Sequence, residues 1–246
     1  MTFFRQIFHE DLGCASYLLG DGEEAIVVDP RFDFGIYIET ASAQGLTIRH
    51  VVDTHDHADH LSGREALAEA TGATAHRPFR EVDPREQDLA AGDELRVGNL
   101  VLRALKAEGH RPEHLAFAGF DLNRTPEPWF VLTGDSLLVG DVARPDLAID
   151  PVDGAEALYD TVQGLIALGD RVEVWPGHVG GSLCGGAGLS QKTSSTIGYE
   201  KIANPELRQT PEKFVRDLVT DIPSRPPNVE RIVEMNRQTG VSLPTE

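Results

Sequence analysis

Short apolar stretches alternate with glycine-containing turns at the start of the chain. The stretches have the length of strands and predict three of them, at Phe3 to Phe8, Ala15 to Leu19 and Ala25 to Val28. The sequence Gly20-Asp21-Gly22 favours a hairpin turn between the second and the third. The chain is therefore expected to begin with strands that are joined by tight turns.

A fourth apolar stretch predicts a strand from Ile48 to Asp53, with a helix on each side of it. Ser62 and Glu65 have the spacing of a capping box, which marks the start of the second helix. The first helix is predicted to start at Asp33, which would cap it, and to run to about Gln44, with Gly45 ending it. The second helix is predicted from Arg64 to Ala70.

The second half of the chain contains further strands and helices in mixed order. Ala155 to Leu168 is the clearest amphipathic helix, and a short last helix is predicted near Val229 to Asn236. The charged stretch from Thr74 to Gly98 is expected to run over the surface. The mixed order indicates a layered α/β sandwich rather than a strictly alternating parallel sheet. Strands are predicted at Glu94 to Val97, Leu100 to Leu105, Leu115 to Phe120, Trp129 to Leu132 and Val172 to Trp175.

Composition narrows the class of protein and its partners. The 246 residues, 40% of them hydrophobic and 25% charged, suit one large α/β domain. A net charge of −18 argues against binding to nucleic acid or to an anionic membrane, although basic groups could gather locally for an anionic small substrate. The apolar runs are too short to cross a bilayer, and Met1 to Glu10 lacks the pattern of a secretory signal. Because Cys14 and Cys184 form no disulfide framework, we expect a cytoplasmic protein, with Cys14 in the core.

Candidate metal ligands follow the ends of four predicted strands. His55, His57, Asp59 and His60 lie directly after the strand that ends at Asp53. Histidines two apart share one face of an extended chain, so we expect the first two to point to the same place while the other two approach from the loop. Three further groups each stand beside a glycine, which lets the backbone turn sharply: His110, Asp135 and His178.

In this order the motifs resemble the signature of the metallo-β-lactamase superfamily. They are Thr54-His55-Asp56-His57-Ala58-Asp59-His60, Gly109-His110, Thr133-Gly134-Asp135 and Pro176-Gly177-His178. The resemblance covers residues 1 to about 200 and implies an αβ/βα four-layer sandwich with a metal site at one rim. We therefore expect a single domain over residues 1–246, with a core of about 1–200 and a helical extension of about 200–246.

The stretches around these motifs are similar to persulfide dioxygenases. They are Gly109 to Leu115, in which Arg111 replaces a small residue of that family, Gly134 to Leu147, Gly181 to Gly185 and Ser195 to Lys201. The resemblance implies one iron(II) per chain, held by His55, His110 and Asp135, with open positions for a thiol persulfide and O2. The implied reaction converts glutathione persulfide, O2 and water into sulfite and glutathione. His57, Asp59, His60 and His178 would then orient the ligands.

The same seven side chains are compatible with a second enzyme class. Two zinc ions bridged by Asp135 would give a thioester hydrolase similar to glyoxalase II, in which a bridging hydroxide attacks the thioester. The identity of the ligands does not separate the two readings, whereas the flanking stretches favour the dioxygenase. A non-catalytic relative would be marked by loss of ligands, and none is lost here.

Substrate contacts are expected from cations beside the metal site, because glutathione carries two carboxylates. The candidate cations are Arg144 and Lys201, and Tyr199 and Cys184 are further candidates for contact with the substrate. No cysteine follows Cys184, so we expect no sulfurtransferase activity from this chain. The sequence leaves the oligomeric state open; dimers are common among the similar proteins, so a homodimer is one candidate. Which thiol carries the persulfide stays open.

Overall fold

The computed structural model describes residues 1–80, 87–180, 182, 184–186, 188–220, 222, 224–225 and 228–238. Among these, the first sheet has the strand order β1-β2-β3-β4-β5, with bounds Phe3–His9, Cys14–Asp21, Glu24–Val28, Thr47–Val52 and Thr74–His76. The strands β1, β2 and β3 are antiparallel neighbours, while β4 lies parallel to β3 and to β5. The predicted hairpin turn between β2 and β3 is confirmed.

The second sheet has the order β13-β12-β9-β8-β7-β6 in the described part of the chain. Its strands are β6 (Glu94–Val97), β7 (Leu100–Lys106), β8 (Leu115–Asp121), β9 (Phe130–Gly134), β12 (Glu173–Pro176) and β13 (Ser195–Thr196). β12 is parallel to β9, and the other pairs are antiparallel. A small hairpin of β10 (Leu137–Leu138) and β11 (Asp141–Val142) follows β9.

The two sheets pack face to face because their strands are apolar on both faces. In β2, Tyr17 and Leu19 belong to the central cluster between the sheets, whereas Leu18 belongs to the outer cluster. In β9, Phe130 and Leu132 point to the same central cluster and Val131 points outward. This is the two-residue repeat of a strand with both faces covered.

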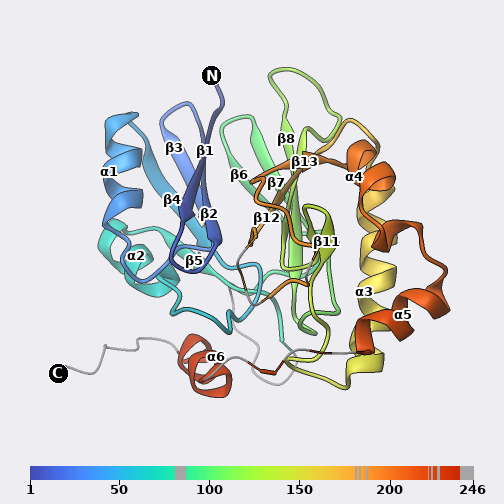
Figure 1. The fold of residues 1–246 in the computed structure, drawn as a ribbon. Helices are drawn as coiled ribbons and strands as arrows, with labels where there is room; N and C mark the ends of the chain where they lie inside the picture. Colours follow the sequence, from blue (N-terminus) through green and yellow to red (C-terminus); the bar gives the residue numbers. More distant parts are fainter. Residues whose placement is uncertain are drawn as a thin grey trace.

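Helices cover the two outer faces, so the chain forms four layers (Figure 1). α1 (Gly35–Ala43) and α2 (Arg64–Thr71) pack on the first sheet, and α3 (Pro151–Ile166) and α5 (Pro211–Val219) on the second. The predicted αβ/βα sandwich is confirmed. α4 (Ile197–Ala203) and the short 3-10 helix η1 (Glu206–Arg208) complete the second side, and α6 (Val229–Arg237) lies apart, below the sheets in Figure 1. None of the described helices is long and apolar enough to cross a membrane.

The predicted caps of α1 and α2 are wrong. α1 begins after Phe34 without a side-chain cap, and Asp33 instead lies 3.6 Å from the guanidinium of Arg31. α2 begins after Gly63 without a side-chain cap, so Ser62 stands one residue too early to be the cap. Its hydroxyl still accepts from the backbone N–H of Arg64 over 3.0 Å while it donates to Asp53 over 3.0 Å.

Helix α3 starts earlier than its apolar stripe predicts. The side chain of Asp150 accepts a hydrogen bond from the backbone N–H of Val152, and Pro151 occupies the first turn, where its missing N–H has no consequence. Leu158, Val162 and Leu165 form the buried stripe that packs on the second sheet. The helix is thereby fixed over the turn that carries His110.

Candidate metal centre

The predicted metal ligands lie at one edge of the two sheets. His55 follows β4, His110 follows β7 and Asp135 follows β9. Nε2 of His55 lies 3.8 Å, and Nε2 of His110 3.5 Å, from Oδ2 of Asp135. All three side chains are buried, and one ligand atom of each lies within 4.8 Å of the others. The structure thus brings together the three residues that the sequence predicts for a single metal ion.

Hydrogen bonds to the two imidazoles decide which ring nitrogen carries the proton. Nδ1 of His110 lies 3.0 Å from the carbonyl oxygen of Arg144, which can only accept. Nδ1 of His55 lies 2.9 Å from the hydroxyl of Thr54, and that hydroxyl already donates to Asp29 over 3.0 Å. Both Nδ1 atoms therefore donate, and each Nε2 keeps the lone pair through which a histidine binds a metal ion.

Burial and neighbouring groups set the charges in this group. Burial lowers the pKa of His55 and of His110, so both imidazoles are neutral near neutral pH. Burial alone would raise the pKa of Asp135, but the imidazole of His178 outweighs burial and holds that pKa below its ordinary value. Nε2 of His110 and Oδ2 of Asp135 have no hydrogen-bond partner among the described residues. Two neutral imidazoles and a carboxylate with such atoms fit a divalent metal ion.

The second oxygen of Asp135 is held by His178. Nδ1 of His178 donates to Oδ1 of Asp135 over 2.7 Å, and Nε2 donates to Oδ2 of Asp59 over 2.9 Å. Burial lowers the pKa of His178, but the carboxylates of Asp135 and Asp59 outweigh burial and raise it well above its ordinary value. The imidazole therefore carries both protons and links the two carboxylates.

His57 does not join the group around Asp135, contrary to the expectation that it points to the same place as His55. Its Nε2 lies 3.2 Å from Oδ1 of Asp29. Burial lowers the pKa of His57, but Asp29 outweighs burial and raises it to about 9. The reason is that β4 ends at Val52, so the chain is no longer extended at the histidines and the two-residue repeat does not apply.

His60 and Asp59 lie beside the group rather than in it. Nδ1 of His60 is 3.1 Å from Oδ1 of Asp59. Nε2 of His60 is buried and has no hydrogen-bond partner in the described part of the chain. Nε2 of His60 could therefore bind a second metal ion, as the hydrolase with two zinc ions would require.

Two residues that hold the site were not singled out from the sequence. Asp29, with φ +53°, accepts from the backbone N–H of Thr54 over 2.6 Å as well as from its hydroxyl. His114 accepts from the backbone N–H of Asp135 over 2.9 Å, and its ring stacks on that of His55 with the centroids 4.9 Å apart. Burial lowers the pKa of His114 to about 3, so it stays an acceptor. The only sequence signals are their positions, directly after a strand and inside the motif that begins at Gly109.

Two glycines permit the close approach of the loops. Gly134 has φ +51°, and a Cβ there would lie 2.6 Å from Nε2 of His114. A Cβ on Gly177 would lie 2.8 Å from Oδ1 of Asp135, the atom that accepts from His178. The glycines predicted to allow sharp turns therefore also leave the space that the ligands occupy.

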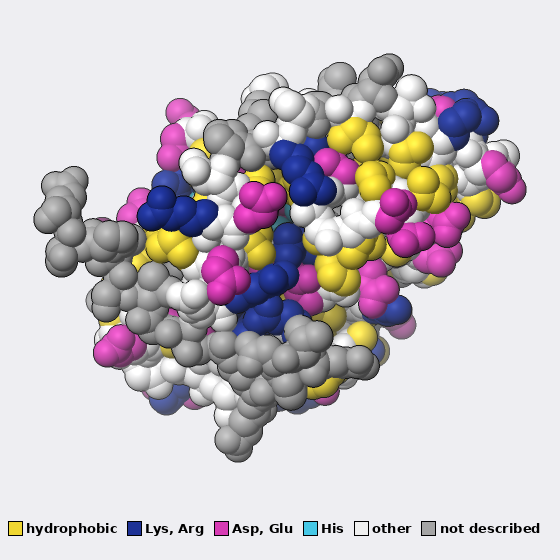
Figure 2. Space-filling view, turned by 90° about the horizontal axis from the view of Figure 1, so that it is seen from below, with side chains coloured by type: hydrophobic (Ala, Val, Ile, Leu, Met, Phe, Trp, Pro, Cys, Tyr) yellow, Lys and Arg dark blue, Asp and Glu magenta, His cyan; other side chains and the backbone are white. Residues whose placement is uncertain are grey.

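Basic side chains gather near the centre of the edge that carries the metal group, although the chain as a whole is acidic (Figure 2). Arg144 lies there, but its guanidinium is buried and binds Asp146 at 2.7 and 2.9 Å, and its carbonyl oxygen serves His110. Arg225 donates to the carbonyl oxygen of Asp146 over 2.6 Å and is half exposed. A substrate contact by Arg144 stays a prediction.

The structure does not bring Tyr199 and Lys201 to the metal group. Both lie on α4, and Lys201 binds Asp170, which precedes β12, over 2.6 Å. His178 follows the other end of β12, and Tyr199 is 60% exposed. A contact of Tyr199 or Lys201 with the substrate stays a prediction.

Cys184 lies next to the metal group. A ligand atom of Cys184, His178 and Asp59 each lies within 4.8 Å of the others. Burial raises the pKa of the Cys184 thiol well above its ordinary value, so it stays protonated. Cys14 is buried in β2, as predicted. Gly181 and Leu183 of the motif around Cys184 lie outside the described residues.

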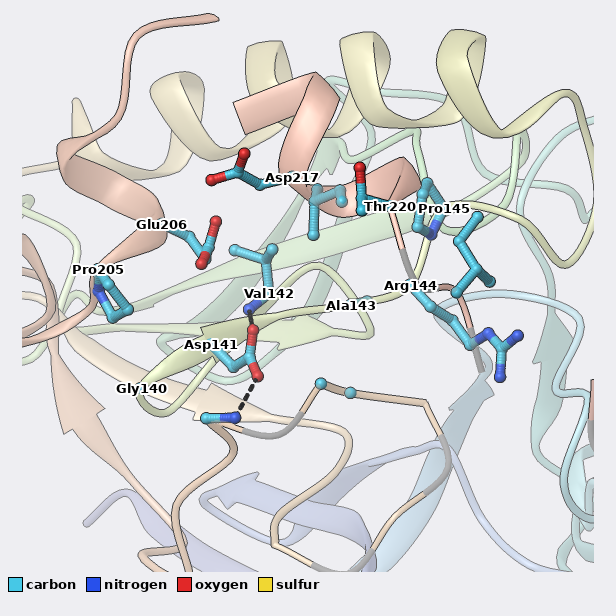
Figure 3. A pocket seen from close by; sticks show the side chains of 15 residues that line it. Gly140, Asp141, Val142, Ala143, Arg144, Pro145, Pro205, Glu206, Asp217 and Thr220 are labelled. Carbon is cyan, nitrogen blue, oxygen red and sulfur yellow. Dashed lines mark hydrogen bonds between the residues drawn. The ribbon is translucent and has the colours of Figure 1, made fainter. Parts of the chain in front are cut away.

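A pocket of about 630 Å³ lies beside the β10–β11 hairpin, whose residues Gly140 to Val142 line it (Figure 3). Asp141, Glu206 and Asp217 line it, and none of the three predicted ligands does. Asp141 accepts from the backbone N–H groups of Val142 and Gly188, and burial raises its pKa and that of Glu206. Arg144 lines the pocket as well, so the pocket adjoins the segment whose carbonyl oxygen holds His110.

Two stacked sheets covered by helices, with a histidine–carboxylate group at one edge, define a metal-dependent enzyme fold. The family described as "Metallo-beta-lactamase superfamily" matches residues 9–178 of this sequence. Because the match covers more than half of the chain, the chain belongs to that superfamily.

Comparison with single proteins shows how extensively this chain is similar to individual members of the superfamily. "Persulfide dioxygenase ETHE1, mitochondrial" of Homo sapiens is 29% identical over 256 aligned positions, which cover 98% of this chain and 90% of that protein. The crystal structure of ETHE1 from Myxococcus xanthus has a TM-score of 0.82 and 30% identity, covering 96% of this chain and 98% of that one. "Hydroxyacylglutathione hydrolase" of Nitrosococcus oceani is 32% identical over 170 positions, 66% of this chain and 61% of that protein. The similarity to the dioxygenases spans both chains, whereas the similarity to the hydrolase is partial.

Proposed function

We propose that the chain is a persulfide dioxygenase that oxidises a low-molecular-weight thiol persulfide with O2 and water to sulfite and the free thiol. The group of His55, His110 and Asp135 supports a metal-dependent enzyme, because its ligand atoms converge in the protonation state that a metal ion needs. The observation that carries the choice of reaction is the extent of similarity, which spans almost the whole chain for the dioxygenases and only part of it for the hydrolase. The near-full-length similarity to a persulfide dioxygenase supports the reaction.

In the proposed enzyme His55, His110 and Asp135 hold one iron(II). Iron(II) bound by two histidines and one carboxylate supplies the redox chemistry and leaves positions open for both substrates. The protein's part is to fix the ligand atoms: Thr54 and the carbonyl oxygen of Arg144 hold the imidazoles with Nε2 toward Asp135. His178 fixes the carboxylate, which leaves its Oδ2 for the metal.

We propose glutathione as the thiol carrier, because its carboxylates match the basic side chains gathered at this edge (Figure 2). The substrates are then small molecules, and Cys184 stands close enough to the metal group to contact the persulfide. We keep the cytoplasm as the proposed compartment, because both cysteines are unpaired and buried.

A glyoxalase II-like hydrolase with two zinc ions is the second candidate. It is favoured by Nε2 of His60, which is buried and has no partner among the described residues. The partial similarity to the hydrolase agrees with the lower rank.

Three measurements decide between the dioxygenase and the hydrolase. They are metal analysis of protein purified without added metal, oxygen uptake with glutathione persulfide, and hydrolysis of a glutathione thioester. We expect about one iron per chain and persulfide-dependent oxygen uptake with sulfite as product. Two zinc ions per chain with thioester hydrolysis, and no oxygen uptake, would replace this proposal by the hydrolase.

A further inference from the structure

Helix α6 packs against the two loops that support the metal group (Figure 1). Val229 and Val233 form a buried cluster with Ala58 and Leu147. Ala58 lies in the histidine loop, residues 54–62, between His57 and Asp59. Leu147 follows the segment in which the carbonyl oxygen of Arg144 holds His110. The last described helix therefore contacts the metal centre's supports on both sides.

Asn236 uses its whole carboxamide on the backbone of the histidine loop. Its side-chain nitrogen donates to the carbonyl oxygens of His57 and His60, each over 2.9 Å. Its side-chain oxygen accepts from the backbone N–H of Ser62, also over 2.9 Å. The residue is 7% exposed, so these bonds are shielded from water. A buried amide with all three bonds made fixes a loop firmly, because each lost bond would leave a buried polar group unsatisfied.

A neighbouring contact attaches the start of the same loop. Arg237 donates from Nε to Oδ2 of Asp56 over 3.1 Å, and Arg80 donates to the same oxygen over 2.9 Å. Asn236 and Arg237 thus hold the histidine loop over most of its length from one side. The opposite side of the loop is held by Asp29 through Thr54 and His57.

The loop in turn positions a metal ligand. Asp59 lies between the two residues whose carbonyl oxygens bind Asn236, and its carboxylate accepts from His178. His178 donates to Oδ1 of Asp135, which directs Oδ2 toward the two histidines. A continuous series of contacts thus connects Asn236 to Asp135 through the loop backbone.

We propose that Asn236 is a positioning residue, which sets the metal affinity of the centre by fixing the histidine loop and, through Asp59 and His178, the carboxylate of Asp135. The proposal rests on the metal centre of the proposed function and not on its persulfide chemistry. Removing a group that orients ligands in this way weakens metal binding about tenfold or more in other metal sites.

Cobalt(II) titration of the metal-free chain, followed by absorption and by competition with a chelator, tests the proposal. In Asn236→Asp one donor is replaced by an oxygen that faces the carbonyls of His57 and His60, while the acceptor for Ser62 remains. We expect the Kd for cobalt(II) to rise about tenfold or more and the spectrum of the saturated protein to change. Asn236→Ala should act in the same direction. Arg231→Ala, on the exposed face of α6, is the matched control and should bind as the parent does.

A purely structural role for Asn236 would lower the melting temperature and leave both the Kd and the saturated spectrum of cobalt(II) as in the parent; that result overturns the proposal. Circular dichroism checks that the variants are folded. If Asn236→Asp and Asn236→Ala are not folded, the same measurements are made on Asn236→Ser, which introduces a hydroxyl. Neither persulfide nor oxygen takes part. A normal cobalt(II) response without dioxygenase activity would count against the proposed function alone.

Discussion

At the scale of single residues, Asp29 decides the direction of a hydrogen-bond series that reaches the metal group. Its carboxylate accepts from the hydroxyl of Thr54, which leaves that oxygen to accept from Nδ1 of His55. In Asp29→Asn the amide nitrogen takes the place of Oδ2 and donates to Thr54. The hydroxyl proton must then turn to Nδ1 of His55, and the imidazole carries its own proton on Nε2, the atom that faces Asp135.

We therefore expect Asp29→Asn to weaken metal binding about tenfold or more, measured by competition with a chelator. The backbone conformation should survive, because asparagine tolerates the positive φ of this position. Asp33→Asn, at a side chain that is 71% exposed, is the control. Equal metal affinity in the two variants would show that the direction of this bond has no influence.

Arg144 behaves, in this structure, as a buried partner of Asp146. The side chains are 5% and 7% exposed and share two hydrogen bonds. We expect Arg144→Ala to lower the free energy of unfolding by about 3 kcal/mol, because it leaves a buried carboxylate without its main partner. Arg124→Ala removes an ion pair whose arginine is 76% exposed and should change stability by well under about 1 kcal/mol. Urea unfolding measures both; a stable Arg144→Ala enzyme with only a raised KM would instead support a direct substrate contact.

At the scale of elements, α3 fixes the turn that carries His110. Gly109 has φ +132°, and a Cβ there would lie 2.6 Å from backbone atoms of Leu158 in the helix. We expect Gly109→Ala to push α3 away and to lower both metal content and melting temperature, because backbone atoms cannot move aside cheaply. A Cβ on Gly164, in the same helix, would meet no atom within 4 Å outside that helix, so Gly164→Ala should stabilise the chain by up to about 1 kcal/mol. Metal content and thermal unfolding of both variants check this, and equal effects would contradict it.

The elements with a long apolar pattern could be predicted from the sequence, and the short ones could not. β2 and β9 alternate between two apolar clusters, a pattern that local sequence carries in full. β5 and β13 have three and two residues, too few to show a period, and they exist because β4 and β12 offer them partners. The predicted cap of α1 was wrong because Asp33 lies beside Arg31 and not at the helix start. The predicted cap of α2 was wrong by one position, since Gly63 is the cap and Ser62 accepts from the N–H of Arg64.

The residues of the candidate site also fall into those that the sequence indicated and those that it did not. His55, His110 and Asp135 follow the ends of predicted strands, and the resemblance of their motifs to known families singled them out as ligands at one edge. Asp29 and Asn236 meet the histidine loop from opposite ends of the chain, and nothing local to either residue shows that contact. Sequence motifs thus indicate the ligands, while Asp29 and Asn236, which hold the histidine loop, become visible only in the folded chain.

At the scale of the whole molecule, a metal ion in the proposed place would connect the two sheets. His55 belongs to the loop after a strand of the first sheet, and His110 and Asp135 follow strands of the second. The central apolar cluster already holds the sheets together without an ion, because residues of both contribute to it. We therefore expect the metal-free chain to stay folded, with unchanged far-UV circular dichroism after chelation.

The metal should nevertheless raise stability by mass action, since it binds the folded chain and not the unfolded one. At a free concentration a hundredfold above its Kd, iron(II) or cobalt(II) should add about 2.7 kcal/mol, a rise in melting temperature of several degrees. Scanning calorimetry under anaerobic conditions, with and without a chelator, measures the shift. Asp135→Asn is the control and should show a much smaller one, because the amide is a poor ligand and its nitrogen cannot bind the ion. Loss of the far-UV signal on chelation would mean that the ion, and not the apolar core, holds the two sheets together.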